Sequence, residues 1–295
     1  MRKQIQKNDI KISVLEAARE EALALALKAG DKLMKYRKRL GSLSITSKEA
    51  QGVASTADIE SEKLIIKGLK KKFPEMNFLA EESAYEQWGG KKEAYAHFQE
   101  MPFVWAIDPL DGTSNFLSGM DYFAVCIGLL HYGVPYMGVV YRPTTGECWS
   151  AIRGHGARYT PQLGGQKFQK LYHKNNTKPL RSSLLVTGFS SEKGDVFDRE
   201  FHLFKSIMCE VRGVRRMGSA ALDLCFVASG VFDGFWESGL APWDVAAAGV
   251  IAQEAGVKIT DYQGRAFHPF QDDFLAGRTP FYGKMSRSLH AIVTD

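Results

Sequence analysis

Two acidic residues follow directly on an apolar run in residues 104–116, and this stretch limits the possible folds more than any other. Residues 104–107 are four apolar residues in a row, a pattern typical of a buried strand. Asp108 and Asp111 come next. Pro109 lies between them and lacks a backbone donor, so we expect the strand to end there. The stretch therefore predicts a buried strand that delivers two carboxylates at its end.

The residues after the two acids favour a sharp turn and a helix start. Gly112 allows a tight turn, and Thr113 with Ser114 can open a helix. In α/β proteins this succession of strand end, turn and helix start is a common ligand site. Carboxylates beside helix-start N–H groups can hold a divalent cation and a phosphate side by side. Asp-Pro and Asp-Gly are also common turn dipeptides, so this stretch alone is equally consistent with a plain strand-to-helix turn.

The composition is that of an ordinary folded protein. With 295 residues the chain is long enough for one large domain or for two that share a core. Its 45% hydrophobic and 24% charged residues match a soluble globular average. The net charge of +5 mildly favours anionic ligands, but the sequence has no zinc-finger spacing, RNA-binding aromatic signature or basic arm. Nucleic acid is therefore not expected as the primary ligand.

Cysteines and apolar runs indicate where such a chain resides. The four cysteines lie in or near apolar stretches without a CxxC pair, which favours buried, reduced thiols in a reducing compartment. Residues 1–12 are basic and polar and do not resemble a secretion signal. No apolar run approaches the roughly 20 residues that span a bilayer. We therefore expect a cytoplasmic protein outside the membrane.

Hydrophobic spacing predicts a first half of helices followed by antiparallel strands, and an alternating second half. Helices are predicted at 14–36 and 59–73, a loop or edge hairpin at 47–57, a surface loop or flap at 83–101, and strands at 77–80, 122–130, 134–141 and 147–152. In the second half, strands are predicted at 184–188, 211–214, 231–236, 257–260 and 274–276. Helices are predicted between the first four of these strands, at 197–209, 219–229 and 243–255. The pattern predicts an α/β fold with an N-terminal α+β domain (1–180) and a C-terminal α/β domain (181–295).

Acidic residues recur at predicted strand ends or helix starts. Five of them lie beside apolar residues rather than on helix faces, namely Asp58, Glu81, Asp108, Asp111 and Asp244. Buried carboxylates are costly when unpaired, so a cation should compensate them. Oxygen ligands without a nearby His or Cys cluster favour Mg²⁺, Mn²⁺ or Ca²⁺ over zinc. Phosphate chemistry favours Mg²⁺ among these.

Four motifs in the right order resemble those of the inositol monophosphatase family. They lie between residues 52 and 277, and they are Glu81–Ser83, Trp105–Phe116, Gly218–Ala221 and Trp243–Gly249 with the trailing Glu254–Gly256. The same superfamily holds fructose-1,6-bisphosphatases and nucleotide phosphatases. The resemblance implies a layered αβαβα sandwich of the sugar-phosphatase type, with metals bound where its two halves meet.

The resemblance also implies a metal site and a reaction. The metal ligands would be the carbonyl of Leu110 and the side chains of Glu81, Asp108, Asp111 and Asp244, most of them within residues 1–180. Two or three Mg²⁺ ions would bind there, one activating a water for in-line attack on phosphorus and another stabilising the leaving alkoxide. Asp58 and Thr113 would orient and deprotonate this water, and Glu81 would share in the catalysis. No covalent phospho-enzyme is implied.

The remaining implied residues bind the substrate or its surroundings, and they are Gly112, Thr113, Gly218, Ser219, Ala220, Glu237 and Glu82. The N–H groups of Gly112 and its successor would hold the phosphate. Glu237 would bind hydroxyls of the alcohol, and Glu82 would hold waters around the metals. Ser219 is equally suited to a helix cap and Glu237 to an exposed strand end, so both alternatives stay open.

Two positions depart from the family pattern. Ala80 stands before Glu81 where the family usually has Gly. Gly52 stands where the family usually has the first acid of an Asp-x-Val-Thr-x-x-Asp motif that ends at Asp58. These departures bear on the flap and on a third metal rather than on the main ligands.

These observations predict a Mg²⁺-dependent phosphomonoesterase for inositol-1-phosphate or a similar polyol or sugar phosphate. The same chemistry on fructose-1,6-bisphosphate, histidinol phosphate or a 3′-phosphoadenosine nucleotide is the alternative, although residues 114–116 look more like the inositol branch. An alternative of another class is a regulatory protein that binds the transcription machinery, as some bacterial relatives do. The resemblance further implies a homodimer and inhibition by lithium.

Overall fold

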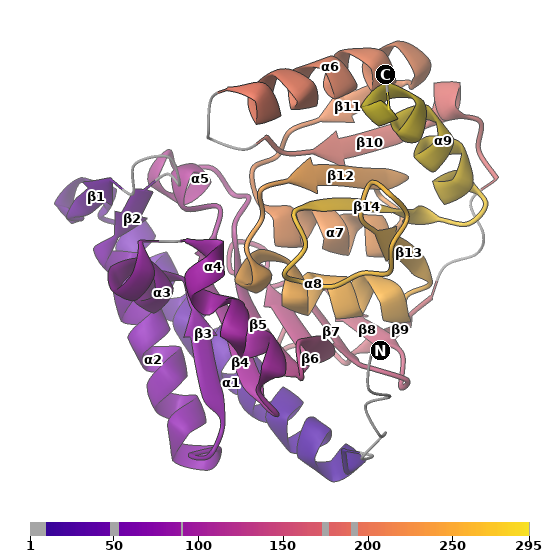
Figure 1. Cartoon of the computed structure of the whole chain (residues 1–295). Helices are drawn as coiled ribbons and strands as arrows, with labels where there is room; N and C mark the ends of the chain where they lie inside the picture. Colours follow the sequence, from indigo (N-terminus) through magenta and orange to yellow (C-terminus); the bar gives the residue numbers. More distant parts are fainter. Residues whose placement is uncertain (1–9, 48–52, 90, 173–176, 190–193, 295) are drawn as a thin grey trace.

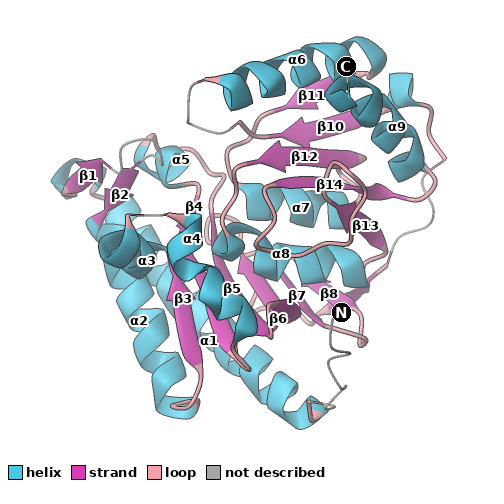
Figure 2. Cartoon of the chain, viewed as in Figure 1, coloured by secondary structure: helices cyan, strands magenta, loops and turns pink. Residues whose placement is uncertain are grey.

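The chain folds into five layers in the order αβαβα (Figure 1, Figure 2). The computed structural model describes residues 10–47, 53–89, 91–172, 177–189 and 194–294. The three helical layers are α1 (Ile12–Arg37) with α2 (Thr56–Lys72), α7 (Ala220–Ser229) with α8 (Pro242–Glu254), and α6 (Asp195–Glu210) with α9 (Phe281–Thr294). A seven-stranded and a five-stranded sheet separate them. The layered sandwich expected from the resemblance is confirmed.

The seven-stranded sheet carries the two acids of the 104–116 stretch on its second strand. Its spatial order follows the chain, as β3 (Asn77–Ala80), β4 (Val104–Asp111), β5 (Ala124–His131), β6 (Val134–Tyr141), β7 (Cys148–Ile152), β8 (Ala157–Thr160) and β9 (Gln169–Leu171). β3 and β4 are parallel, and the later pairs are antiparallel. All eight residues of β4 are buried, since α2 packs against it and α8 packs against it as well. A near-continuous apolar run is the pattern of a strand covered on both faces.

The five-stranded sheet is mixed. Its spatial order is β11 (Gly213–Arg215), β10 (Leu184–Thr187), β12 (Gly234–Ser238), β14 (Asp273–Arg278) and β13 (Val257–Thr260). β10 runs parallel to β11 and β12, and β14 runs antiparallel to β12 and β13. α7 and α8 fill the space between the two sheets and share one apolar core with both.

Small residues let α8 lie close against the seven-stranded sheet. A Cβ added at Gly138 would lie 2.3 Å from the carbonyl oxygen of Ala247, and one at Gly128 would lie 3.1 Å from the Ala247 nitrogen. Both contacts are closer than ordinary packing allows, so only glycine fits at Gly138 without movement. The alanine-rich sequence of α8 therefore reflects its burial between two sheets.

The polar stretch 83–101 is not the surface loop or flap that we predicted. It consists almost entirely of α3 (Glu81–Trp88), α4 (Lys92–Tyr95) and the 3₁₀-helix η3 (Ala96–Glu100). Tyr95 and Phe98 are buried, and the Tyr95 ring centroid lies 5.3 Å from that of Trp243 in α8. The prediction was wrong because a few apolar residues anchor these short helices while their many charged neighbours face water.

β4 runs to Asp111 rather than ending at Pro109 as predicted. Its pairing with β5 is regular up to Asp108 and resumes at Asp111 after a shift in register. Pro109 lies in this irregularity, where a missing backbone donor breaks no ladder bond. The short helix α5 (Thr113–Leu117) then begins, as expected.

The other elements are shorter or were not predicted. They are the hairpin β1 (Ile45–Ser47) and β2 (Val53–Ser55), the 3₁₀-helices η1 (Leu40–Ser42) and η4 (Leu180–Ser182), and α9, which the sequence pattern did not identify. The hairpin agrees with the prediction for 47–57, although Gly52 lies outside the described residues. Cys209 is exposed, contrary to the prediction of buried thiols, whereas the other three cysteines are buried.

Two further points concern the whole chain. Within the described ranges, every helix is too short or too polar to cross a membrane. The division into domains at residue 180 stays a prediction. The last strand of the first sheet ends at Leu171, and the first strand of the second begins at Leu184.

Candidate functional site

Asp108 and Leu110 lie in the irregular end of β4. Asp108 is 2% exposed, and its Oδ1 accepts the N–H of Leu110 at 2.9 Å. The carbonyl oxygen of Leu110 accepts the Thr113 hydroxyl at 3.0 Å. The Asp108 carboxylate thus stabilises the backbone around Pro109, and the Leu110 carbonyl connects the strand end to the following helix.

Asp111 joins the two halves of the molecule, because its carboxylate binds the start of α7. The N–H of Ala221 donates to Oδ2 at 2.9 Å, and the Ser219 hydroxyl donates to the same oxygen. Burial raises the pKa of Asp111 to about 6, although these two donors lower it. Ser219 occupies the N-cap position but makes no side-chain cap bond, so it serves Asp111 instead of capping α7 as the alternative expected.

Gly112 and Gly218 meet where the turn after β4 approaches the segment before α7. Gly112 has φ of +92°, and a Cβ there would lie 3.1 Å from the carbonyl oxygen of Gly218. Asn115 reinforces this approach, since its Nδ2 donates to the carbonyls of Tyr122 at 2.7 Å and Met217 at 2.8 Å. The residues expected to hold phosphate and those expected to line the alcohol side are therefore neighbours.

Asp58 and Thr113 are hydrogen-bonded to each other. Asp58 is fully buried in the first turn of α2, and its Oδ1 accepts the Thr113 hydroxyl at 2.8 Å. Its Oδ2 accepts the N–H of Ser55 at 2.8 Å and also the Ser55 hydroxyl. Burial raises the pKa of Asp58, and the bonds from Ser55 and Thr113 oppose that rise. Capping of α2 thus holds the carboxylate in position for Thr113.

Glu81 and Glu82 open helix α3, and a buried carboxylate of α2 holds that opening. Glu62 is 3% exposed. Its Oε2 accepts the N–H of Glu82 at 2.7 Å, and its Oε1 accepts the N–H of Ser83 at 2.9 Å and the Ser83 hydroxyl. Sequence reasoning missed Glu62. The available signal was an acid four residues after Asp58, on the same face of a helix.

Asp244 lies in the first turn of α8, where its Oδ2 accepts the N–H of Ala241 at 2.7 Å. Burial raises its pKa well above the usual range, and the charges of Glu81 and Asp111 add to the rise. Burial likewise raises the pKa of Asp108, followed by the charges of Glu81, Asp111 and Asp244. The charges of Glu81, Asp111 and Asp244 therefore act on Asp108, although the four expected side-chain ligands come from three elements, α3, β4 and α8.

This set of donors suits a divalent cation. Neighbouring negative charges oppose one another, and a bound cation removes that penalty. Each donor is an oxygen, which favours Mg²⁺ over softer metals. Within the described part of the chain, no three His, Cys, Asp or Glu side chains are gathered as a ready-made ion site.

Glu237 is a buried residue of β12 and not the exposed strand end of the alternative. It is 9% exposed, and burial raises its pKa well above the usual range. Its carboxylate lies against the backbone of Gly188, where a Cβ would come within 1.8 Å of Oε1. Glycine at 188 is therefore required for this position of the Glu237 side chain.

Asp223 is a second acid near Glu237 that sequence reasoning missed. It is 1% exposed on α7, and its Oδ1 accepts the Tyr122 hydroxyl at 2.7 Å. Its charge raises the pKa of Glu237, whereas Arg216 lowers it. An aspartate within an otherwise apolar helix was the available signal.

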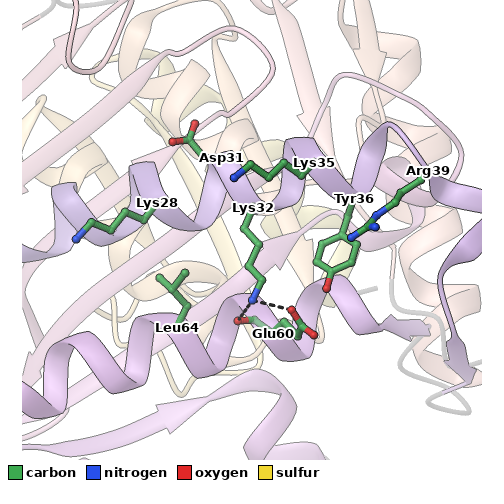
Figure 3. A pocket seen from close by; sticks show the side chains of 8 residues that line it. All are labelled: Lys28, Asp31, Lys32, Lys35, Tyr36, Arg39, Glu60 and Leu64. Carbon is green, nitrogen blue, oxygen red and sulfur yellow. Dashed lines mark hydrogen bonds and ion pairs between the residues drawn. The ribbon is translucent and has the colours of Figure 1, made fainter.

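A hollow lies between α1 and α2 (Figure 3). It measures about 500 Å³ and is lined by Lys28, Asp31, Lys32, Lys35, Tyr36, Arg39, Glu60 and Leu64. None of the expected site residues is among them. A second hollow of about 690 Å³ between α2 and α3 does include Glu62, Glu82 and Ser83 in its lining.

Comparisons with known proteins agree with this arrangement. The profile of the inositol monophosphatase family matches residues 14–293. The Nus factor SuhB of Pseudomonas aeruginosa is 34% identical over 260 residues, which cover 88% of this chain and 90% of that protein. The chloroplastic phosphatase IMPL1 of Arabidopsis thaliana is 36% identical over 248 residues, or 82% of this chain and 62% of that protein.

A solved inositol monophosphatase from Anabaena (Nostoc) is 34% identical and superposes with a TM-score of 0.74, covering 94% of this chain and 97% of that one. The match of the family profile to nearly the whole chain agrees with the four motifs and with the layered fold. The chain therefore belongs to the inositol monophosphatase family.

Proposed function

We propose that this protein is a Mg²⁺-dependent phosphomonoesterase that converts inositol-1-phosphate, or a similar polyol or sugar phosphate, to the alcohol and inorganic phosphate. The observation that carries the proposal is the group Glu81, Asp108, Asp111 and Asp244, whose charges act on one another beside the Asp58–Thr113 hydrogen bond. Membership of the inositol monophosphatase family supports the same reaction.

These four carboxylates and the Leu110 carbonyl would hold two or three Mg²⁺ ions. The ions would supply positive charge for the phosphoryl oxygens and for the leaving alkoxide. Glu82, at the start of α3, would hold waters around them. Chelation should therefore abolish activity, and readdition of Mg²⁺ should restore it.

Thr113 and Asp58 would handle the proton of the attacking water. The Thr113 hydroxyl has one proton, and its shorter contact is with Asp58, at 2.8 Å against 3.0 Å for the Leu110 carbonyl. With that proton directed to Asp58, the hydroxyl oxygen is left to accept a hydrogen bond from water. This pair orients the water and draws its proton toward a buried carboxylate.

Substrate binding would involve both halves of the molecule. Backbone N–H groups of Gly112 and Thr113 would hold the phosphate, and the neighbouring segment Gly218–Ala220 would line the alcohol side. Glu237 would accept hydrogen bonds from hydroxyl groups of a polyol. A buried carboxylate facing the substrate favours a hydroxyl-rich alcohol over an apolar one.

A phosphate-release assay tests the proposal directly. The panel contains inositol-1-phosphate, fructose-1,6-bisphosphate, histidinol phosphate and a 3′-phosphoadenosine nucleotide, each with Mg²⁺ and with EDTA. We expect Mg²⁺-dependent release with the highest kcat/KM for inositol-1-phosphate. Preference for another substrate would overturn the substrate assignment alone, and no Mg²⁺-dependent release from any substrate would overturn the reaction.

A second candidate function is regulatory binding to the transcription machinery. It is favoured by the name of the Pseudomonas aeruginosa relative, a Nus factor. Co-sedimentation with purified bacterial RNA polymerase tests it, with bovine serum albumin as a control. Retention of the polymerase-bound fraction in an Asp108→Asn variant would separate this binding from catalysis.

Three further features stay proposals, of which the homodimer and the lithium inhibition come from the family resemblance and cytoplasmic residence comes from the cysteines and apolar runs of the sequence. We expect a homodimer, which light scattering of the purified protein measures. We expect cytoplasmic residence and inhibition by lithium, which fractionation and the phosphate-release assay measure.

A further inference from the structure

Helix α2 carries two buried carboxylates one turn apart, and each is hydrogen-bonded to the start of another helix. Asp58 binds Thr113, the first residue of α5, and Glu62 binds Glu82 and Ser83 in the first turn of α3. Residues four apart on a helix lie on the same face, separated by about 6 Å along the axis. The proposed function uses only the first of these two carboxylates.

The structure constrains Glu81 from both sides. On its N-terminal side, Ala80 is paired with Ile107 as the last pair of the parallel ladder of β3 and β4, so Glu81 and Asp108 each follow directly on this pair. On its C-terminal side, Glu62 accepts the backbone N–H groups of both Glu82 and Ser83. Glu81 is the single residue between these two attachments.

The contacts of Glu62 suit a positioning role. The helix start offers N–H groups without partners inside the helix, and a carboxylate satisfies them more strongly than water does at a buried site. No side chain at the N-cap position of α3 can do this, because Ala80 occupies it and makes no cap bond. The cap is supplied instead by an acid of α2, which is 3% exposed.

We propose that Glu62 is a positioning residue that fixes the start of α3 and thereby aims Glu81 at the site beside Asp108. This inference rests on the proposed function, since it gives Glu81 its metal-binding task. Losing the Glu62 carboxylate does not alter the chemistry of the Glu81 side chain. It removes the attachment that follows Glu81 in the chain, so Glu81 is no longer aimed at the site. The affinity for Mg²⁺ then falls, while substrate binding at saturating Mg²⁺ is preserved.

Three variants graded by lost contacts test this proposal. Glu62→Ala removes every contact to α3, Glu62→Gln keeps one acceptor oxygen, and Ser83→Ala removes the hydroxyl contact alone. We expect the Mg²⁺ concentration for half-maximal activity to rise about 30-fold in Glu62→Ala and about 10-fold in Glu62→Gln, within the range known for residues that orient metal ligands. In Ser83→Ala, which loses a single contact, it should rise only about twofold, below that range. The KM for inositol-1-phosphate at saturating Mg²⁺ should change less than twofold in each variant.

A readout without metal complements the kinetics. Hydrogen exchange of the Glu82 and Ser83 amides in the metal-free protein should accelerate in the same order. Glu60→Gln, a substitution of a half-buried acid on the same helix that makes no contact with α3, is the matched control and should leave exchange and Mg²⁺ dependence unchanged.

The outcomes are distinct. Wild-type amide exchange and Mg²⁺ dependence in both Glu62→Gln and Ser83→Ala would overturn the positioning role, even if Glu62→Ala fails to fold. The positioning role would also be overturned if the variants lost kcat at saturating Mg²⁺ but needed the same Mg²⁺ concentration as the wild type for half-maximal activity. Absence of Mg²⁺-dependent hydrolysis in the wild-type protein would instead overturn the proposed function itself.

Discussion

Two glutamates of α2, only two residues apart, lie in opposite surroundings. Glu60 faces the hollow between α1 and α2, where its carboxylate lies 2.7 Å from the Lys32 ammonium (Figure 3). Bonds from Lys32 and then Tyr36 lower the pKa of Glu60. Glu62 faces inward, where burial raises its pKa although Ser83 and the backbone of Glu82 donate to it. The negative charge of Glu60 is therefore balanced by a cation near the surface, whereas that of Glu62 is stabilised only by neutral hydrogen-bond donors in the interior.

The difference separates structural acids from candidate functional ones. A partly exposed pair such as Lys32–Glu60 contributes about 0–1 kcal/mol to stability. A buried carboxylate offset only by neutral donors is costly, and a group of such carboxylates is costlier still. We therefore propose that a ligand, rather than stability, accounts for the buried acids Asp108, Asp111 and Glu237 and the half-buried Asp244.

The largest expected effect comes from neutralising one of the interior acids. Asp108→Asn should lower kcat/KM for inositol-1-phosphate at least about 1,000-fold, since a ligand charge for the metal is lost. The metal-free variant should nevertheless be more stable, by on the order of 1–2 kcal/mol, because one charge leaves a repelling group. Phosphate release and urea unfolding in EDTA measure the two effects.

The control for this variant is a substitution of an exposed acid. Asp31→Asn, at an exposed position lining the α1–α2 hollow, should change neither activity nor stability by a measurable amount. Full activity in Asp108→Asn would contradict the metal site. If metal-free Asp108→Asn instead lost as much stability as a core substitution does, the proposed repulsion among these carboxylates would be contradicted.

Removal of the Thr113 hydroxyl should have the second-largest effect. Thr113→Ala should lower kcat about 100-fold with little change in KM, because the group that orients the water is lost while the N–H of residue 113 remains. Thr113→Ser keeps a hydroxyl and should retain activity within about tenfold. Equal activity of the alanine and serine variants would rule out the role proposed for this hydroxyl.

A crowding substitution at Gly188 tests Glu237 without changing its charge. A Cβ at this position lies within 1.8 Å of the Glu237 carboxylate, so Gly188→Ala must displace that side chain. We expect KM for inositol-1-phosphate to rise about tenfold, equivalent to one lost hydrogen bond to a charged group. Gly41→Ala, at a position with nothing within 4 Å, is the control. An unchanged KM would remove Glu237 from the substrate site.

The smallest expected effect concerns how the contributions of Glu60 and Glu62 to stability change with pH. These two changes should have opposite signs. The lowered pKa of Glu60 means that its contribution to stability is present above its ordinary pKa of 4.5 and is lost as the pH falls through the lowered value. The raised pKa of Glu62 means that its contribution is present below 4.5 and is lost as the pH rises through the raised value.

Urea unfolding of metal-free protein between pH 3.5 and 7 compares these two contributions. As the pH rises, the free energy of unfolding of the wild type relative to Glu60→Gln should increase, and that relative to Glu62→Gln should decrease. The pH-dependent change in the free energy of unfolding due to Glu60 should be small, since water and salt screen a partly exposed pair. Slopes of the same sign would show that burial does not distinguish the two residues.

Sequence reasoning succeeded where function depends on a short stretch of chain. The run 104–116 predicted a buried strand, two acids and a helix start, and each is present. Its error at Pro109 was local, because a bulge accommodates proline without ending the strand. It failed for 83–101, where burial of Tyr95 against Trp243 depends on a helix about 150 residues away in sequence.

Hydrophobic spacing in the sequence indicated an α/β fold, and the resemblance of four motifs to a known family indicated the family, the layered fold and the acids to which we assign the metal. Only the tertiary structure decided how those acids are held. Asp111 binds the start of α7, Glu62 binds the start of α3, and Gly188 makes room for Glu237. Each of these contacts joins segments distant in sequence, and no local pattern specifies which distant segments the packing of two sheets brings together.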